Sequence, residues 1–150
     1  TGQLRFPATQ AASGGANVLD DYEEGTWTPT LAFGGASVGI TYDSNIATYT
    51  KVGRKVSVSC YLALTAKGTS VGAAVIGGLP FTAAVGNEFI GVASVYLSVV
   101  TFADWPKGII SGGGTSLALS ETTNAGVHTT LTDADFINTS VVIFSATYFV

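Results

Sequence analysis

From Thr26 onward the chain consists of short apolar runs that alternate with polar residues and end at glycine, asparagine or aspartate. Valine, isoleucine, threonine, tyrosine and phenylalanine dominate these runs, as they do in β-strands. Apolar spacing of three and four residues does not persist long enough to predict an α-helix, and Asp133–Phe136 predicts at most one short turn. We therefore expect an all-β fold, an antiparallel domain of the β-sandwich or jelly-roll-like kind.

The glycine, asparagine and aspartate residues that end the apolar runs predict ten strands. They are expected at Thr26–Phe33, Gly39–Asp43, Ala47–Val52, Lys55–Ala66, Ala73–Ile76, Glu88–Thr101, Gly108–Ile110, Ser116–Leu119, Val127–Thr130 and Val141–Phe149. Gly53 lies between two alternating runs and is free to take a positive φ, so Val52–Lys55 is the clearest hairpin. The last run is apolar to Val150, and we expect it to be tied into a sheet or an interface because frayed ends are usually polar.

Composition divides the chain in two. Residues 1–18 are small and rich in glycine and alanine, with Arg5 as their one charge, and we expect an extended stalk or linker segment there. Residues 19–150 are long enough for one domain with its own core, the β-sandwich tip domain. The chain has no methionine and begins at Thr1, so we expect it to be the end piece of a longer protein.

The chain is unusually poor in charge. Charged residues make up 11% of it, the net charge is −4 and the mean hydropathy is +0.43. No apolar run approaches the roughly 18–20 residues of a membrane helix, so we expect no membrane insertion. A chain this uncharged is expected to hide surface against copies of itself, as a homo-oligomer. Its acidic balance argues against a nucleic-acid partner, because binding phosphates needs a basic face.

Neither cysteine nor histidine points to a metal site or to catalysis. Cys60 is the single cysteine, which excludes an internal disulfide and any cysteine-based zinc site, and its alternating run favours burial. His128 is the single histidine, and no serine or cysteine lies in a nucleophile motif. We expect no metal, no cofactor and no enzyme activity.

Four of the ten acidic residues lie within five positions, at Asp20, Asp21, Glu23 and Glu24. Paired carboxylates can serve glycosidase chemistry, and clustered oxygens can bind Ca²⁺. These acids are nearly consecutive, without the spacing of a calcium loop and without a matching second cluster. We therefore favour ion pairing with the basic cluster of the chain. That cluster is Lys51, Arg54 and Lys55.

The two tryptophans are expected in different environments. Trp27 alternates with threonines on a predicted strand, which favours core packing. Trp105 lies in a proline-containing loop flanked by charges, where an exposed indole can stack on a sugar ring. If the domain binds a glycan, Asp104, Trp105 and Lys107 are the candidate residues.

Four segments of the chain form a recognisable set: Phe6–Gln10, Leu19–Pro29 with the sequence LDDYEEGTWTP, Tyr49–Arg54 and Gly78–Phe81. Together they resemble the terminal modules of bacteriophage tail fibres and tailspikes. The resemblance covers about the first half of the chain; after Val85 it rests on β character and the apolar terminus. It implies a homotrimeric β-structured tip at the distal end of a virion's tail fibre, which attaches to a bacterial surface glycan, either capsule or lipopolysaccharide.

In such a three-fold fibre the acidic segment of one chain is expected to lie against the basic hairpin of its neighbour. The leading expectation for function is a non-catalytic receptor-binding tip. The alternative is a structural cap that trimerises the fibre end and helps it fold, without glycan binding of its own. A depolymerase fragment is disfavoured, because in tailspikes the catalytic carboxylates usually lie in an upstream β-helix.

Overall fold

The computed structural model describes residues 2, 5–6, 15, 18, 21–86 and 91–150 of the 150-residue chain. Their secondary structure is almost entirely β. The strands are β1 (Tyr22–Thr26), β2 (Thr30–Phe33), β3 (Ile40–Val52), β4 (Lys55–Lys67), β5 (Ala74–Gly77), β6 (Gly91–Val100), β7 (Trp105–Ile110), β8 (Ser116–Thr122), β9 (His128–Thr130) and β10 (Phe136–Phe149). A single 3₁₀ turn, η2 (Asp133–Asp135), is the helical element of the described residues and confirms the predicted short turn.

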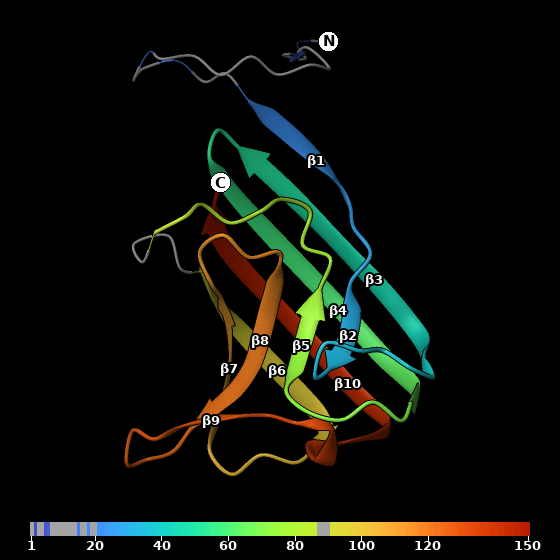
Figure 1. Ribbon diagram of the computed structural model, residues 1–150. Helices are drawn as coiled ribbons and strands as arrows, with labels where there is room; N and C mark the ends of the chain where they lie inside the picture. Colours follow the sequence, from blue (N-terminus) through green and yellow to red (C-terminus); the bar gives the residue numbers. More distant parts are fainter. Residues whose placement is uncertain (1, 3–4, 7–14, 16–17, 19–20, 87–90) are drawn as a thin grey trace.

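All ten strands belong to one antiparallel sheet with the order β1-β3-β4-β10-β6-β7-β8-β5-β2, and β9 pairs with β8. The sheet curls, so that β7, β8, β5 and β2 lie over the long strands β3, β4 and β10 (Figure 1). The all-β antiparallel prediction is therefore confirmed. The two layers of this sandwich-like fold are halves of a continuous hydrogen-bonded sheet.

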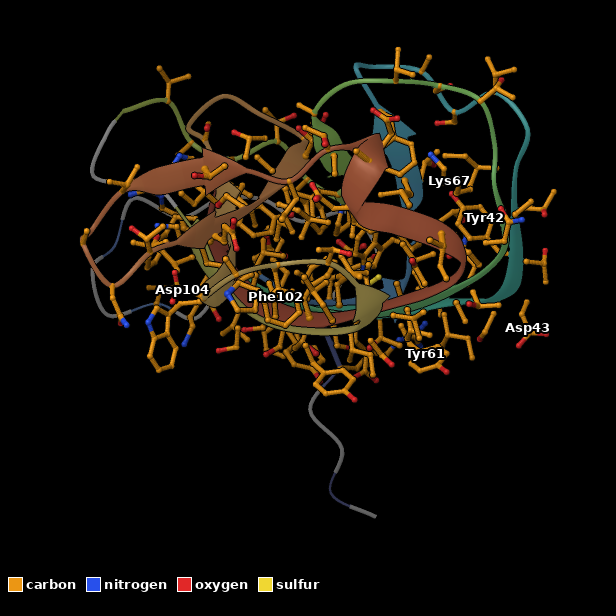
Figure 2. All side chains as sticks on the ribbon, turned by 90° about the horizontal axis from the view of Figure 1, so that it is seen from below. Tyr42, Asp43, Tyr61, Lys67, Phe102 and Asp104 are labelled. Carbon is orange, nitrogen blue, oxygen red and sulfur yellow. The ribbon has the colours of Figure 1, made fainter. Side chains whose placement is uncertain are left out.

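The core lies between these halves, where side chains fill the space (Figure 2). Strand β4 shows why, because its side chains alternate in burial: Val56, Val58 and Leu62 point inward, whereas Ser57 and Tyr61 do not. From the opposite half come inward residues of β2, β5, β7 and β8. These are Leu31, Phe33, Ile76, Ile110, Leu117 and Leu119, each completely buried.

The apolar last run is the middle strand of the long half of the sheet. β10 pairs with β4 along one edge and with β6 along the other, with Phe144 opposite both Cys60 and Val95. Phe144 also packs against Trp27, with ring centroids 6.3 Å apart. The prediction that this run is tied into a sheet is confirmed.

Two strand boundaries differ from the predictions for a physical reason. The strand predicted over Thr26–Phe33 is two strands, because the backbone leaves β3 after Trp27 and crosses to the other layer, where β2 pairs with β5. Pro29 lies at this crossing and has no N–H to donate to a ladder. Conversely, the two strands predicted within residues 39–52 are the continuous β3, whose register shifts between Thr41 and Ser44 form a bulge.

The predicted hairpin at Gly53 is confirmed, with φ of 56° at that glycine. The predicted division at residues 18 and 19 stays a prediction, since most of residues 1–20 lie outside the described part, as does Glu88. Phe6 of the predicted stalk contacts Tyr22, with ring centroids 5.9 Å apart. In the described part of the chain, no helix has the length and apolar character needed to cross a membrane.

Candidate functional site

Three of the segments that resemble tail-fibre modules meet at one edge of the sheet. β1 lies antiparallel to β3, which places Asp21 in an ion pair with Lys51 and lets the Tyr49 hydroxyl donate to Glu23 Oε1 at 2.5 Å. The Phe81 ring packs edge-on against Tyr49, with centroids 5.3 Å apart, and lies 5.7 Å from Lys51 Nζ. We call these five residues the clasp.

The contacts within the clasp affect the ionisation of Tyr49 and the pairing of two nearly buried charges. The hydrogen bond to Glu23 raises the pKa of Tyr49, because a phenol next to a carboxylate is harder to ionise. Lys51 and Asp21 are both nearly buried, so each neutralises a charge that would otherwise be poorly solvated. The clasp therefore joins β1 to the sheet through contacts within one chain.

Two glycines in these segments are explained by close approach. The Tyr49 ring lies over Gly25, where an added Cβ would be 2.9 Å from the tyrosine oxygen. At Gly78, φ is +85° and an added Cβ would be 2.5 Å from the Thr28 carbonyl oxygen. Only glycine satisfies both demands at Gly78. The segments are thus fitted to one another at the level of the backbone.

The other described residues of the predicted ion-pair set lie near the clasp. Glu24 accepts a hydrogen bond from the Tyr22 hydroxyl at 2.9 Å, and Arg54 Nε donates to the Val150 carbonyl at 3.0 Å. Asp20 lies outside the described residues. Lys55 is paired through its backbone with Phe149. Asp21 thus meets Lys51 of its own chain, and the pairing between neighbouring chains stays a prediction.

A second cluster lies on the other half of the sheet, where β7, β8 and β9 run side by side. Their register places six side chains on one face in two rows of three. One row is Trp105, Thr122 and His128, and the other is Lys107, Ser120 and Thr130. We call this group the β7–β9 surface.

Trp105 is the most prominent member of this surface. Its side chain is 66% exposed, and its indole Nε1 donates to the Asn124 amide oxygen at 3.4 Å. Lys107, two residues along the same strand, donates to the Thr122 hydroxyl. Neither ion pair found among the described residues involves Lys107. An exposed indole next to an ammonium group and hydroxyls is an arrangement that can bind a sugar ring.

Of the three candidate glycan residues, the structure brings two together on one face. Asp104 precedes β7 and lies at the end of the loop (Figure 2). The Glu121 carboxylate anchors this loop by accepting from the backbone N–H groups of Ala103 at 2.5 Å and Asp104 at 3.3 Å. The expectation of a loop at Trp105 is corrected, because Trp105 and Lys107 begin strand β7 and pair with β8.

The sequence prediction missed the partners that β8 and β9 supply. Thr122 and His128 join Trp105 through strand pairing, and Asn124 does so from the turn between β8 and β9; nothing in their local sequence signals it. Ser120 is buried and its Oγ has no hydrogen-bond partner in the described part of the protein.

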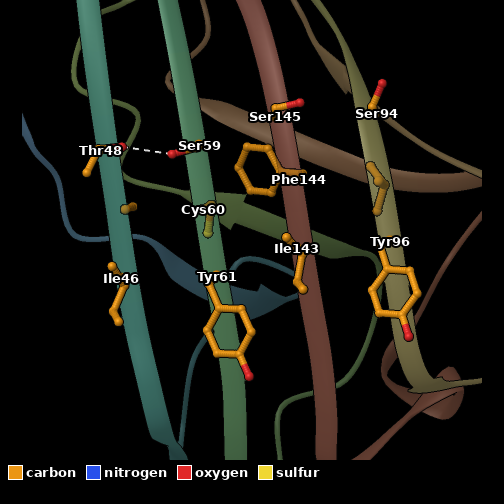
Figure 3. A pocket seen from close by; sticks show the side chains of 12 residues that line it. Ile46, Thr48, Ser59, Cys60, Tyr61, Ser94, Tyr96, Ile143, Phe144 and Ser145 are labelled. Atoms are coloured by element: carbon orange, nitrogen blue, oxygen red, sulfur yellow. Dashed lines mark hydrogen bonds between the residues drawn. The ribbon is translucent and has the colours of Figure 1, made fainter.

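A third feature is a shallow depression of about 530 Å³ on the outer side of the long strands. Ile46, Tyr61, Ile143 and Tyr96 form a row across it, one residue from each of β3, β4, β10 and β6 (Figure 3). Cys60 points the other way and is buried, which raises the pKa of its thiol to about 12. The predicted burial of Cys60 is confirmed.

Metal-binding geometry is not found in the part of the chain that the structure describes. There, no group of three or more histidine, cysteine, aspartate or glutamate side chains could hold an ion. Lys67 and Asp133 form the second ion pair at 3.7 Å, and Asp133 also accepts from the Gly72 N–H at 2.7 Å. These contacts fasten η2 to its neighbours.

Comparison with known proteins identifies the fold. No protein-family model and no curated protein matches the chain. A search of solved structures finds the crystal structure of Dettilon tailspike protein (gp208), with a TM-score of 0.71 and 16% sequence identity. The match covers 85% of this chain and 23% of the tailspike chain, so this chain spans about a quarter of that protein's length. The two chains share a fold over that region.

Proposed function

We propose that this chain is a module of a bacteriophage tail protein that attaches the virion to a bacterial surface glycan, either capsule or lipopolysaccharide. The observation that carries the proposal is the β7–β9 surface. There an exposed indole, a lysine and several hydroxyls converge on a rigid sheet. The fold shared with a tailspike and the tail-fibre motifs support the phage context. The module is proposed to act at the distal end of the fibre, as a homotrimer.

In this proposal Trp105 supplies the stacking surface for a sugar ring. Lys107 and the hydroxyls beside it bind the polar groups of the sugar, because a pyranose presents apolar C–H faces and polar edges. Asp104 lies at the border of the surface, where it can accept from sugar hydroxyls. The chain is proposed to bind the glycan without hydrolysing it.

The test is binding of the chain to an array of bacterial capsule and lipopolysaccharide glycans. We expect Trp105→Ala to lower binding at least tenfold, and Lys107→Ala to lower it by a smaller factor, because stacking supplies most of the contact area. Val71→Ala, at an exposed valine in the loop between β4 and β5, is the control and is expected to bind normally.

Two results would contradict the proposal. One is unchanged binding by Trp105→Ala, which would place the sugar elsewhere. The other is release of reducing ends from a bound polysaccharide, which would show hydrolysis and revive the enzyme alternative.

A structural cap that trimerises and helps fold the fibre end is the second candidate. The clasp favours the folding part of this role, since the motif residues described there contact one another within the chain. Loss of trimers on deletion of the module, together with no glycan binding on the array, would support the cap over the receptor-binding tip.

A further inference from the structure

We infer that the outer face of β3, β4, β10 and β6 packs against a second copy of this chain. This inference rests on the assembly part of the proposed function and is independent of glycan binding. It assigns that assembly to particular residues, which neither the motifs nor the shared fold identifies.

The register of the four strands places their outward side chains in rows of four. Starting from β3, the rows are Ser44, Ala63, Val141 and Ser98; Ile46, Tyr61, Ile143 and Tyr96; Thr48, Ser59, Ser145 and Ser94; and Thr50, Ser57, Thr147 and Val92. We call these four rows the uncharged face. No acid, base or amide side chain occurs among them.

The face is apolar where it protrudes. In one row, Ile46 and Tyr96 are 63% and 62% exposed and Tyr61 between them is 39% exposed; Val92, two rows away, is 65% exposed. Figure 3 shows the isoleucines and tyrosines of one row side by side on the same face of the sheet. Contiguous apolar surface of this kind on a water-facing sheet usually marks a contact with another protein.

Four hydroxyl groups of the face are partnered with one another within the chain. Thr48 Oγ1 and Ser59 Oγ are 2.8 Å apart (Figure 3), and Ser57 Oγ and Thr147 Oγ1 are 3.3 Å apart. Covering these pairs with an apolar surface therefore leaves their hydrogen bonds intact. The same pairing leaves fewer free donors and acceptors for a sugar.

The size of the face suits a protein partner. Four strands about 4.8 Å apart and four rows about 6.7 Å apart span roughly 19 Å by 27 Å, or about 500 Å² before the relief of the side chains is counted. The side chains raise this toward the roughly 800 Å² per partner of a stable interface. Flat β faces pack on one another about 10 Å apart, so the face can receive a sheet like itself.

Charge identifies the occupant as another copy of the chain. Each copy carries a net charge of −4, so copies repel one another over most contacts. A face without charge is where that repulsion is smallest and where apolar burial is largest. A glycan is the less suitable occupant, because the face lacks the carboxylates and amides that commonly bind sugar hydroxyls.

The test is the molar mass of the folded chain in solution, measured by light scattering after size exclusion. We expect two or three times the single-chain mass of 15.2 kDa. Ile46→Lys and Tyr96→Lys, at outward positions whose change spares the core, are expected to give the single-chain mass with unchanged circular dichroism. Val38→Lys, at a valine that is also 63% exposed but lies outside the face, is expected to keep the oligomer.

Further measurements of molar mass and of glycan binding separate a protein partner from the alternatives. Self-association that persists in high salt supports the uncharged face, whereas loss in salt assigns the contact to ion pairs between chains and overturns the inference. A single-chain mass for the parent overturns it too. If Ile46→Lys leaves the mass unchanged but abolishes binding on the glycan array, the face binds sugar instead. If the array shows no binding for any variant while Ile46→Lys dissociates the oligomer, the inference stands and the glycan proposal fails.

Discussion

The clasp and the β7–β9 surface use the same residue types in opposite ways. Lys51 is nearly buried against Asp21 and the Phe81 ring, whereas Lys107 donates to the Thr122 hydroxyl. The clasp pairs Lys51 with Asp21 within the chain, and the β7–β9 surface presents Trp105 to solvent.

The two tryptophans show the same contrast. Trp27 follows β1 directly and is buried, with its Nε1 donating to the Thr48 carbonyl at 3.2 Å. Trp105 extends from the start of β7 into solvent. The comparison teaches that the segments resembling tail-fibre modules pack against one another within the chain, while the exposed indole lies outside those segments.

One of the two largest expected effects comes from breaking the clasp at its ion pair. Lys51→Ala leaves the Asp21 carboxylate nearly buried without its cation, and we expect a loss of about 3 kcal/mol in the free energy of unfolding. Lys55→Ala, on the exposed side of the same hairpin, is the control and is expected to cost less than about 0.5 kcal/mol. Denaturant unfolding measures both. An equal loss at Lys55 would point to pairing between chains instead.

A second substitution tests the close backbone fit beside the clasp. Gly78 and Gly35 have nearly the same φ, +85° and +86°, but an added Cβ meets the Thr28 carbonyl at Gly78 and nothing within 4 Å at Gly35. We expect Gly35→Ala to cost about 1 kcal/mol from backbone conformation alone. Gly78→Ala is expected to cost about 2 kcal/mol more, because the neighbouring backbone must move. Similar losses in thermal or denaturant unfolding would rule out the crowding argument.

A third, smaller effect concerns Tyr148, which connects the end of β10 to the loop that holds Phe81. Its hydroxyl donates to the Phe81 carbonyl at 3.0 Å and accepts from the Phe81 N–H at 3.3 Å. Tyr148→Phe leaves both backbone groups without this partner, so we expect a loss of about 1–2 kcal/mol near neutral pH.

The same substitution should change how the free energy of unfolding depends on pH in alkaline solution. Burial raises the pKa of Tyr148 from 10.0 to about 12, so the folded state holds the phenolic proton more tightly than the unfolded state. Its contribution is present below pH 10 and is lost as pH rises from 10 to about 12. Stability of the parent should therefore fall more steeply there than that of Tyr148→Phe. Parallel curves would contradict a buried phenol at this position; the other tyrosines and Cys60 remain in both proteins.

The smallest effect is expected at the β7–β9 surface. Trp105→Ala should change the free energy of unfolding by less than about 0.5 kcal/mol, because the side chain is mostly exposed and its one recorded hydrogen bond is long. Denaturant unfolding of this variant beside Lys51→Ala measures the contrast directly. A loss of several kcal/mol would mean that Trp105 supports the fold, and the distinction between the two regions would fail.

Sequence patterns predicted most elements but not their pairing. Alternation identified β4, and glycine identified the turn at Gly53, because both signals are local. The crossing at Trp27–Pro29 was missed, since Thr and Trp suit a strand wherever they lie and only the hydrogen-bond partner shows that the layer changes. The proline and the flanking charges indicated Trp105 as a candidate glycan residue. Thr122 and His128, in contrast, reach it only through the register of β7, β8 and β9.

The sequence by itself determined that this chain is β-structured, low in charge and provided with a buried Cys60, because alternation and composition act over a few residues. Tertiary structure decided the rest. It brought Asp21, Tyr49, Lys51 and Phe81 into one clasp, and it gathered the outward residues of four strands into one uncharged face. These arrangements depend on which strands pair and in what register, and pairing between distant segments is set by the closure of the whole core rather than by any local run of residues.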